Sequence, residues 1–148
     1  MNLILKITNK RSDGYHEIDT IMQEIDLADY LSFSINDSKE ISLTMDGISI
    51  PGPLEDNLII KTAKLFFEKK PQLKIDFGVK IHLHKVIPCG SGMGGGSSNV
   101  VSTLKGLNHI FNFPFSLNQL SEMAAELGSD TVFFLYGGRC HCIGRGEI

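Results

Sequence analysis

Apolar and polar residues alternate along several short segments of the chain, the pattern of half-buried β-strands. The alternation is clearest at residues 41–45 and 79–83, where an apolar residue occupies every second position. Short apolar segments at 3–8, 16–25, 30–35, 132–136 and 139–143 also predict strands. Polar or glycine- and proline-rich segments at 9–14 and 47–53 predict turns between them.

Three other segments place apolar residues at helical spacing. The first runs to about Lys69 and begins after Asp56 or Asn57, either of which can cap it. The second spans 97–111 and ends at a Phe-Pro pair, and the third spans 116–127, with Ser and Gln in the spacing of a capping box. Strands come first and then mix irregularly with helices, which indicates an α+β fold rather than a doubly wound sheet.

Composition and charge exclude several classes of protein. The chain has 148 residues, enough for one domain, and its 42% hydrophobic and 21% charged residues exclude a disordered or collagen-like protein. No apolar run approaches the ~20 residues that span a bilayer, and the first residues lack the features of a signal peptide. A net charge of −3 argues against nonspecific nucleic-acid binding. The three cysteines, Cys89, Cys140 and Cys142, fit a reducing compartment such as the cytoplasm.

Glycine is concentrated in one loop between a predicted strand and a predicted helix. Of 15 glycines, five lie within residues 90–96, in the segment Pro88-Cys89-Gly90-Ser91-Gly92-Met93-Gly94-Gly95-Gly96-Ser97-Ser98. The N-terminus of a helix leaves backbone N–H groups unpaired and carries partial positive charge. Glycine lets such a backbone approach an oxyanion closely. The segment therefore predicts a phosphate-binding loop.

Other interpretations of this loop fit its residues less well. A Walker loop requires Lys and then Ser or Thr after its last glycine, but Gly96 follows Gly95 here. The spacing of Gly90, Gly92 and Gly95 satisfies the dinucleotide fingerprint, yet no acidic residue ends a second strand about 20 residues later. A merely flexible glycine-rich turn is the remaining alternative.

The loop resembles the second conserved segment of the GHMP small-molecule kinases. Three further segments and the C-terminal residues narrow the resemblance: Lys10-Arg11-Ser12-Asp13-Gly14-Tyr15-His16-Glu17, Glu55-Asp56-Asn57-Leu58-Ile59, Leu127-Gly128-Ser129-Asp130-Thr131-Val132-Phe133-Phe134, and Gly144-Arg145-Gly146-Glu147. Together they are similar, over the whole chain, to the branch of the family that acts on a cytidine-diphosphate-linked methylerythritol in non-mevalonate isoprenoid biosynthesis. The resemblance implies the family's N-terminal ATP-binding domain, of the ribosomal protein S5 domain 2-like fold, with helices packed on a mixed or antiparallel sheet.

The resemblance also implies a role for particular residues. ATP, with Mg²⁺, would donate its γ-phosphoryl group to the 2-hydroxyl of the substrate, and Asp130 would be the catalytic base. Asn57 and Lys85 would lie near the adenosine, while Tyr15, His16 and Asn2 would bind the substrate. The ATP phosphates would be held by Pro88, Gly90, Ser91, Gly92, Gly94, Gly95, Gly96, Ser97 and Ser98.

Without the resemblance, several of these residues have plainer explanations. Asp130 could cap the element that follows Gly128, and Tyr15 is most simply a core or turn aromatic. His82 and His84 share one strand face and could be a metal pair, but no third ligand follows at a useful spacing, so a solvated face is favoured. No metal-ligating residue is therefore assigned.

The family pattern is not met in full. Its first conserved segment normally contains Pro-x-Ala-Lys before the position of Asn2, and its members carry a second, ferredoxin-like domain. We therefore expect the chain to be an N-terminal fragment of such an enzyme, bacterial and cytoplasmic or from a plastid. Alternatives are a nucleotide-binding fragment without activity, or another GHMP kinase such as a homoserine or mevalonate-type enzyme. The sequence does not indicate an oligomeric state.

Overall fold

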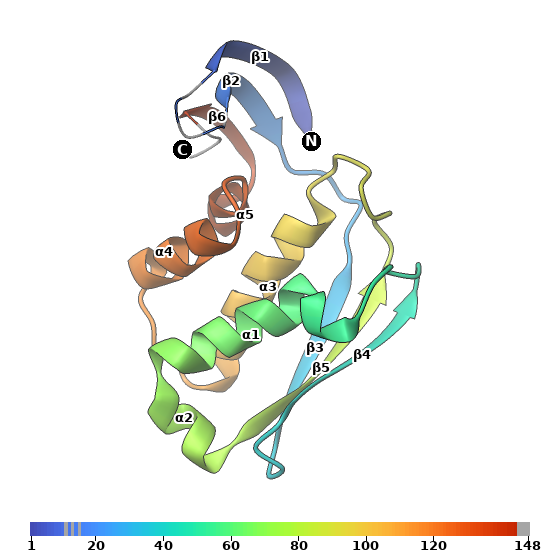
Figure 1. Ribbon diagram of the computed structural model, residues 1–148, viewed down its shortest axis with the longest axis vertical. Coiled ribbons are helices and arrows are strands. Elements are labelled where there is room, and N and C mark those ends of the chain that lie inside the picture. The colour runs from blue at the N-terminus through green and yellow to red at the C-terminus, as the bar shows by residue number, and fades with distance from the viewer. Residues whose placement is uncertain (11, 13, 15, 145–148) are drawn as a thin grey trace.

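The computed structural model describes residues 1–10, 12, 14 and 16–144. Its strands are β1 (Asn2–Lys10), β2 (His16–Gln23), β3 (Tyr30–Asn36), β4 (Ile41–Gly47), β5 (Gly78–Lys85) and β6 (Arg139–Gly144). Its helices are α1 (Leu58–Lys69), α2 (Pro71–Asp76), α3 (Gly95–Ile110), α4 (Leu117–Leu127) and α5 (Thr131–Tyr136), with a 3₁₀ turn at Leu54–Asp56 (Figure 1).

The strands form two separate three-stranded sheets. One is antiparallel, in the order β1-β2-β6. The other is mixed, in the order β3-β5-β4, with β5 antiparallel to β3 and parallel to β4. The α+β class, with helices packed on mixed and antiparallel sheets, is therefore confirmed.

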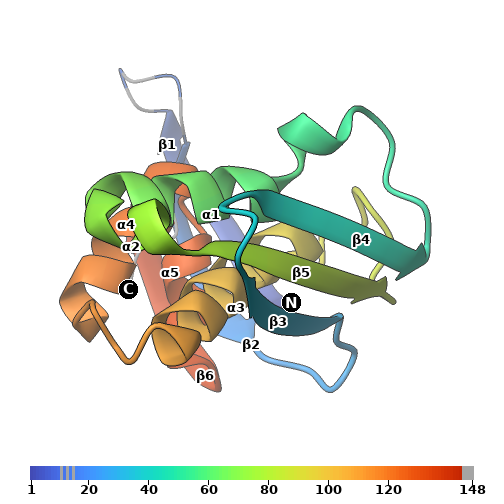
Figure 2. The same ribbon diagram turned by 90° about the horizontal axis from the view of Figure 1, so that it is seen from below.

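A layer of helices covers one face of the mixed sheet (Figure 2). In β5, Val79, Ile81 and Leu83 are fully buried, whereas Lys80 and His84 on the opposite face are exposed, as the alternation predicted. The buried face packs against α1 and α3 in one core with α4. Phe66 of α1 belongs to this core and is 0% exposed. Because β5 and α3 share this core, the loop between them is supported at both ends.

The caps of two helices are those that the sequence indicates. The Asn57 side chain accepts a hydrogen bond from the backbone N–H of Ile59, so Asn57 rather than Asp56 caps α1. Ser116 and Gln119 form both halves of the capping box of α4. Helix α3 begins at Gly95, two residues earlier than the apolar spacing suggested. The short α2 was not predicted.

The segment 132–136 is a helix, and the prediction of a strand there was wrong. Its β-branched and aromatic residues favour strands in isolation, but residues 131–136 form α5, which contacts α3 and α4. Leu135 joins the main core, whereas Phe133 packs against Met22 and Cys142 of the antiparallel sheet. Both sides of this short helix are buried, so its burial alternates much as that of a strand would.

Among the described residues, no helix combines the length and the hydrophobicity needed to cross a bilayer.

Candidate functional site

The glycine-rich loop connects the end of β5 to the start of α3, as its sequence indicated. Gly90, Gly92 and Gly94 have φ angles of 69°, 72° and 68°, whereas the non-glycine residues between them are not in this left-handed region. Backbone φ therefore changes sign from residue to residue along the loop. Such alternation turns successive N–H groups toward one concave side and is the geometry of an anion-binding nest.

The amides of this loop are not used by the protein's own carbonyl groups. Among the described residues, no carbonyl accepts a hydrogen bond from the backbone N–H of Gly90, Gly92, Gly94, Gly95 or Gly96. The first helical bond of α3 begins only with the N–H of Ser98, which donates to the carbonyl of Gly94. The N-terminus of a sixteen-residue helix thus presents free donors and its partial positive charge to the same place.

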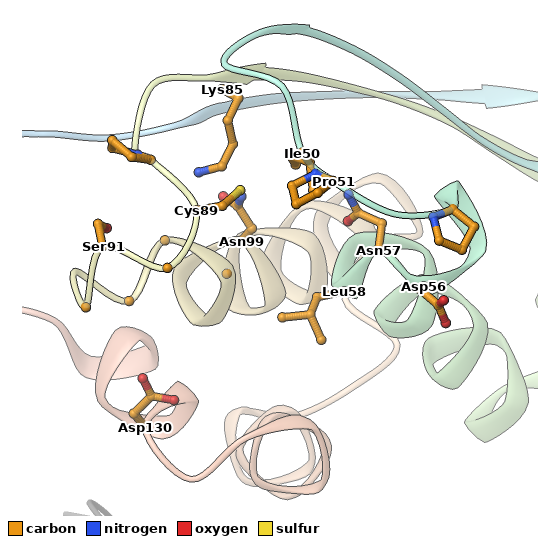
Figure 3. A pocket seen from close by; sticks show the side chains of 17 residues that line it. Ile50, Pro51, Asp56, Asn57, Leu58, Lys85, Cys89, Ser91, Asn99 and Asp130 are labelled. Atoms are coloured by element: carbon orange, nitrogen blue, oxygen red, sulfur yellow. The ribbon is translucent and has the colours of Figure 1, made fainter.

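A cavity of about 470 Å³ opens beside the loop (Figure 3). Asp130 lies at one side of it, and Pro51 and Asn57 lie at the other. The lining residues outside the loop are Ile50, Pro51, Pro53, Asp56, Asn57, Leu58, Lys85, Asn99 and Asp130, and those in the loop are Pro88, Cys89, Gly90, Ser91, Gly92, Gly94, Gly95 and Gly96. This combination of an apolar end with a polar glycine-rich end suits a ligand that has an aromatic ring and a charged tail.

Asp130 precedes the first residue of α5, but its side chain does not cap that helix. Its Oδ1 atom instead accepts a hydrogen bond of 2.8 Å from the hydroxyl of Ser97 in the first turn of α3. Its Oδ2 atom lies 3.9 Å from the position that a Cβ on Gly94 would take. Among the described residues no donor bonds to Oδ2, so this oxygen can accept a proton or a hydrogen bond from a ligand.

Lys85 lines the cavity, yet its ammonium group is already bound by the protein. Nζ donates to Asp29 Oδ2 at 2.6 Å and to the carbonyl of Ile87, and the Lys85 side chain is only 4% exposed. Burial alone would raise the pKa of Asp29, but hydrogen bonds from Lys85, Ile87, Val86 and Asn99 outweigh it and lower the pKa below its ordinary value. No sequence pattern marked Asp29, which lies in the connection before β3.

The polar groups of Asn57 divide between the helix and the cavity. Oδ1 caps α1, while Nδ2 contacts only Met45 Sδ, at 3.6 Å, among the described residues. A thioether is a weak acceptor. The side-chain amide of Asn57 can therefore still donate to a ligand at the apolar end of the cavity.

Two of the residues predicted for the phosphate site, Ser97 and Ser98, do not line the cavity. The hydroxyl of Ser97 is bound to Asp130, and the hydroxyl of Ser98 donates to the carbonyl of Gly95 within its own helix. Asn2 shares a small cavity of about 30 Å³ with Gly94 and Asp130, and it donates to Thr20 Oγ1 at 3.0 Å. The structure thus places Asn2 close to Asp130.

His16 does not line the cavity. It begins β2 and is exposed, opposite Lys10, whereas Asn2 pairs with Met22 at the other end of the hairpin. Met22 lies six positions after His16, which is about 20 Å at ~3.4 Å per residue. Tyr15 lies outside the described residues. The substrate roles of both residues stay predictions.

The two histidines of β5 lie on the exposed face of the mixed sheet. His84 Nδ1 is 2.6 Å from Asp46 Oδ1, and His82 Nδ1 is 2.9 Å from Thr44 Oγ1. In the described part of the chain, no group of three or more His, Cys, Asp or Glu side chains is placed to hold a metal ion.

Comparison with known proteins adds independent findings. Residues 57–138, just over half of the chain, match the model of the GHMP kinases N terminal domain. The whole chain is 47% identical to the 4-diphosphocytidyl-2-C-methyl-D-erythritol kinase of Prochlorococcus marinus strain AS9601 and covers 46% of that protein. The chain is also 44% identical to the protein of the same name from Synechococcus sp. strain CC9605, in an alignment that covers 99% of this chain and 47% of that protein. The chain thus spans about half the length of the curated relatives it matches.

The solved structures give the same picture. A crystal structure of 4-(cytidine 5'-diphospho)-2C-methyl-D-erythritol kinase superposes with a TM-score of 0.80 at 35% identity, covering 99% of this chain and 50% of that one. The mevalonate kinase of Methanococcus jannaschii superposes with a TM-score of 0.65 at 17% identity, a likeness of fold alone.

Proposed function

Because the chain belongs to the GHMP kinase family, we propose that it binds ATP in the cavity beside the glycine-rich loop and transfers the γ-phosphoryl group to the 2-hydroxyl of 4-diphosphocytidyl-2-C-methyl-D-erythritol. The observation that carries the proposal is the row of unpaired loop amides at the start of α3, with Asp130 beside it. The names of the relatives, which are 44–47% identical to this chain, supply the substrate.

The two ends of the cavity suit the two ends of ATP. The adenine would lie against Ile50, Pro51 and Leu58, where the amide of Asn57 can donate to it. The phosphates would lie against the loop, where free N–H groups and the α3 N-terminus stabilise negative charge. Lys85, whose charge is balanced by Asp29, would shape the wall between them rather than act as a free cation.

Phosphoryl transfer depends mostly on positioning and charge stabilisation. The Ser97 hydroxyl fixes one oxygen of Asp130 and leaves the other open toward the loop. That open oxygen would accept the proton of the attacking 2-hydroxyl while the loop amides hold the phosphates. Asn2, which shares the small cavity with Asp130, would help to position the alcohol.

The residues at this end also fit Mg²⁺. Oxygen donors suit this ion, which proteins usually hold through one or two carboxylates and the phosphates of the substrate. The carboxylate of Asp130, which lines the cavity beside the loop, is a donor of that type. When bound with ATP, the ion would neutralise phosphate charge.

The test is transfer by the chain itself. It is incubated with ATP, Mg²⁺ and 4-diphosphocytidyl-2-C-methyl-D-erythritol, and ADP and phosphorylated product are measured by mass spectrometry. We expect both products to appear in equal amounts and only when the cytidyl substrate is present. The proposal is contradicted if ADP is released at the same rate with and without the cytidyl substrate, or if the phosphoryl group is transferred to mevalonate or homoserine instead. ATP binding without transfer leaves a nucleotide-binding module and contradicts the kinase activity.

A further inference from the structure

One buried carboxylate joins the two ends of the glycine-rich loop. Asp29 lies in the connection between β2 and β3, far from the loop in sequence, and its side chain is 1% exposed. It accepts hydrogen bonds from Lys85 Nζ at 2.6 Å, from the backbone N–H groups of Val86 and Ile87 at 2.7 and 2.8 Å, and from Asn99 Nδ2 at 2.9 Å.

These donors lie on both sides of the loop. Lys85 ends β5, and Val86 and Ile87 lead into the loop, whereas Asn99 lies in the second turn of α3. The segment 88–94 is therefore suspended between two anchor points that one carboxylate holds together. The anchors also pack closely, since a Cβ on Gly95 would lie 2.9 Å from Ile87 Cγ2 and 3.2 Å from Lys85 Nζ.

This arrangement stabilises the loop in one conformation before any ligand arrives. A glycine-rich segment has unusual conformational freedom, and ordering it during binding would weaken affinity. Fixing both ends of the loop reduces that freedom. The charges of Asp29 and Lys85 are paired, and each has further hydrogen bonds, which is the condition under which buried charges persist.

We propose that Asp29 is a positioning residue for nucleotide phosphates: it ties the end of β5 to the second turn of α3 and so holds the loop amides in their binding arrangement. The proposal rests on the proposed function, because it takes the loop to be the phosphate site. Asp29 does not itself touch the nucleotide.

The first test compares Asp29→Asn with Asp26→Asn, a control at an exposed carboxylate in the same connection. In Asp29→Asn the new side-chain oxygen can still accept from Val86 and Ile87, but the NH₂ group opposes the donors of Lys85 and Asn99. Calorimetric titration should show ATP binding weakened by at least about tenfold in Asp29→Asn. The affinity for AMP, which has one phosphate, should fall clearly less than the affinity for ATP. A general loss of folding would instead weaken the binding of both nucleotides equally. Asp26→Asn should match the parent chain.

The second test needs no nucleotide. Hydrogen exchange of the free protein should show faster exchange at the amides of Val86, Ile87 and Ser98 in Asp29→Asn, with the amides of α1 unchanged. The neutral side chain accepts from Val86 and Ile87 more weakly than a carboxylate does, and it no longer binds Lys85 and Asn99. If Asp29→Asn does not fold, Asp29→Glu is measured instead, since it keeps the charge but displaces the carboxylate by one methylene.

The two tests separate the two proposals. If the parent chain binds no ATP but Asp29→Asn speeds exchange at both ends of the loop, the proposed function fails. Asp29 then still holds the two ends of the loop together, but only as a structural residue. A folded variant that binds ATP within twofold of the parent, with unchanged exchange at the loop ends, overturns the positioning role alone. Equal losses for ATP and AMP also overturn it.

Discussion

Among single residues, Asp130 shows how one carboxylate can be held and still be available. One of its oxygens is fixed by the Ser97 hydroxyl, and the other faces the loop without a donor from the described protein. The same division occurs in Asn57, which caps α1 with its oxygen and retains its amide for the cavity. In both residues a structural bond orients the side chain, which is how a rigid site avoids an entropic cost on binding.

Replacing Asp130 by Asn should remove the proton acceptor while keeping its shape and its bond from Ser97. We expect kcat for the proposed transfer to fall by about 10²–10⁴-fold, the usual contribution of a general base. ATP affinity measured without Mg²⁺ should change little because the loop amides are untouched. Steady-state kinetics and calorimetric titration measure the two quantities. Asp37→Asn, in the exposed turn after β3, is the control and should behave as the parent chain does.

Cys89 offers a chemical test of where ATP binds. Cys89 is exposed and lines the cavity, whereas Cys142 is buried. Burial, and to a smaller extent the nearby Cys140, raise the pKa of the Cys142 thiol. Iodoacetamide should therefore alkylate Cys89 much faster than Cys142, because the thiolate is the reactive form. Saturating ATP should slow alkylation of Cys89, as peptide mass spectrometry would show. Equal rates at Cys89 with and without ATP would place the nucleotide elsewhere.

Among the secondary-structure elements, the joint between the loop, α3 and α5 determines the site. Gly94 precedes α3 in a left-handed conformation, with its α-carbon packed against α5. A Cβ there would lie 2.7 Å from Phe134 Cζ. A side chain at this position would require the Phe134 ring to shift, and the close approach places Asp130, just before α5, next to the loop.

Gly94→Ala tests that joint, and Gly138→Ala is a matched control. The φ angles are 68° and 69°, so alanine costs roughly 1–2 kcal/mol of folding free energy at either position. Only Gly94 faces Phe134; nothing lies within 4 Å of a Cβ on Gly138. Urea unfolding should therefore show a larger loss for Gly94→Ala, and only this variant should also lose ATP affinity. Equal behaviour of the two variants would mean that the packing against α5 has no role.

The elements also show which sequence signals are reliable. Three local signals appear in the structure as predicted: the cap at Asn57, the capping box at Ser116 and the alternation of buried and exposed residues along β5. The prediction of a strand at 132–136 failed because burial between α3 and the antiparallel sheet overrides the local preference of these residues for a strand. Helix α5 in turn positions Asp130, so the loop could be predicted from sequence but its distance to Asp130 could not.

In the whole molecule, the cavity forms at one end of the mixed sheet, between the segments that follow β4 and β5 and the first turns of α1 and α3. β5 and α3 share the main core, and Asn2 of β1 lines the small cavity together with Asp130. Asp29 lies in the connection that links the two sheets, and its bonds reach both β5 and α3. The stability of the fold and the order of the loop therefore depend on the same buried pair.

This dependence predicts an acid sensitivity with a definite sign. The pKa of Asp29 is lower in the folded protein than in the unfolded chain, where it is about 3.9. Its contribution to stability is thus complete above that pH and is lost as the pH falls toward the folded pKa. Urea unfolding between about pH 3 and 7 should show stability falling more steeply on acidification in the parent chain than in Asp29→Asn. Parallel curves would contradict the prediction.

The amino-acid sequence determined the loop and its helix, because glycine positions and helix starts are local and carry their chemistry in the order of residues, and it predicted a phosphate ligand there. It also determined the family through the segments around the loop, Asn57 and Asp130. Only the tertiary structure decided that Lys85 is balanced by Asp29, that Ser97 holds Asp130, and that 132–136 is helical. These depend on contacts between segments far apart in the chain, where burial and pairing outweigh local preference.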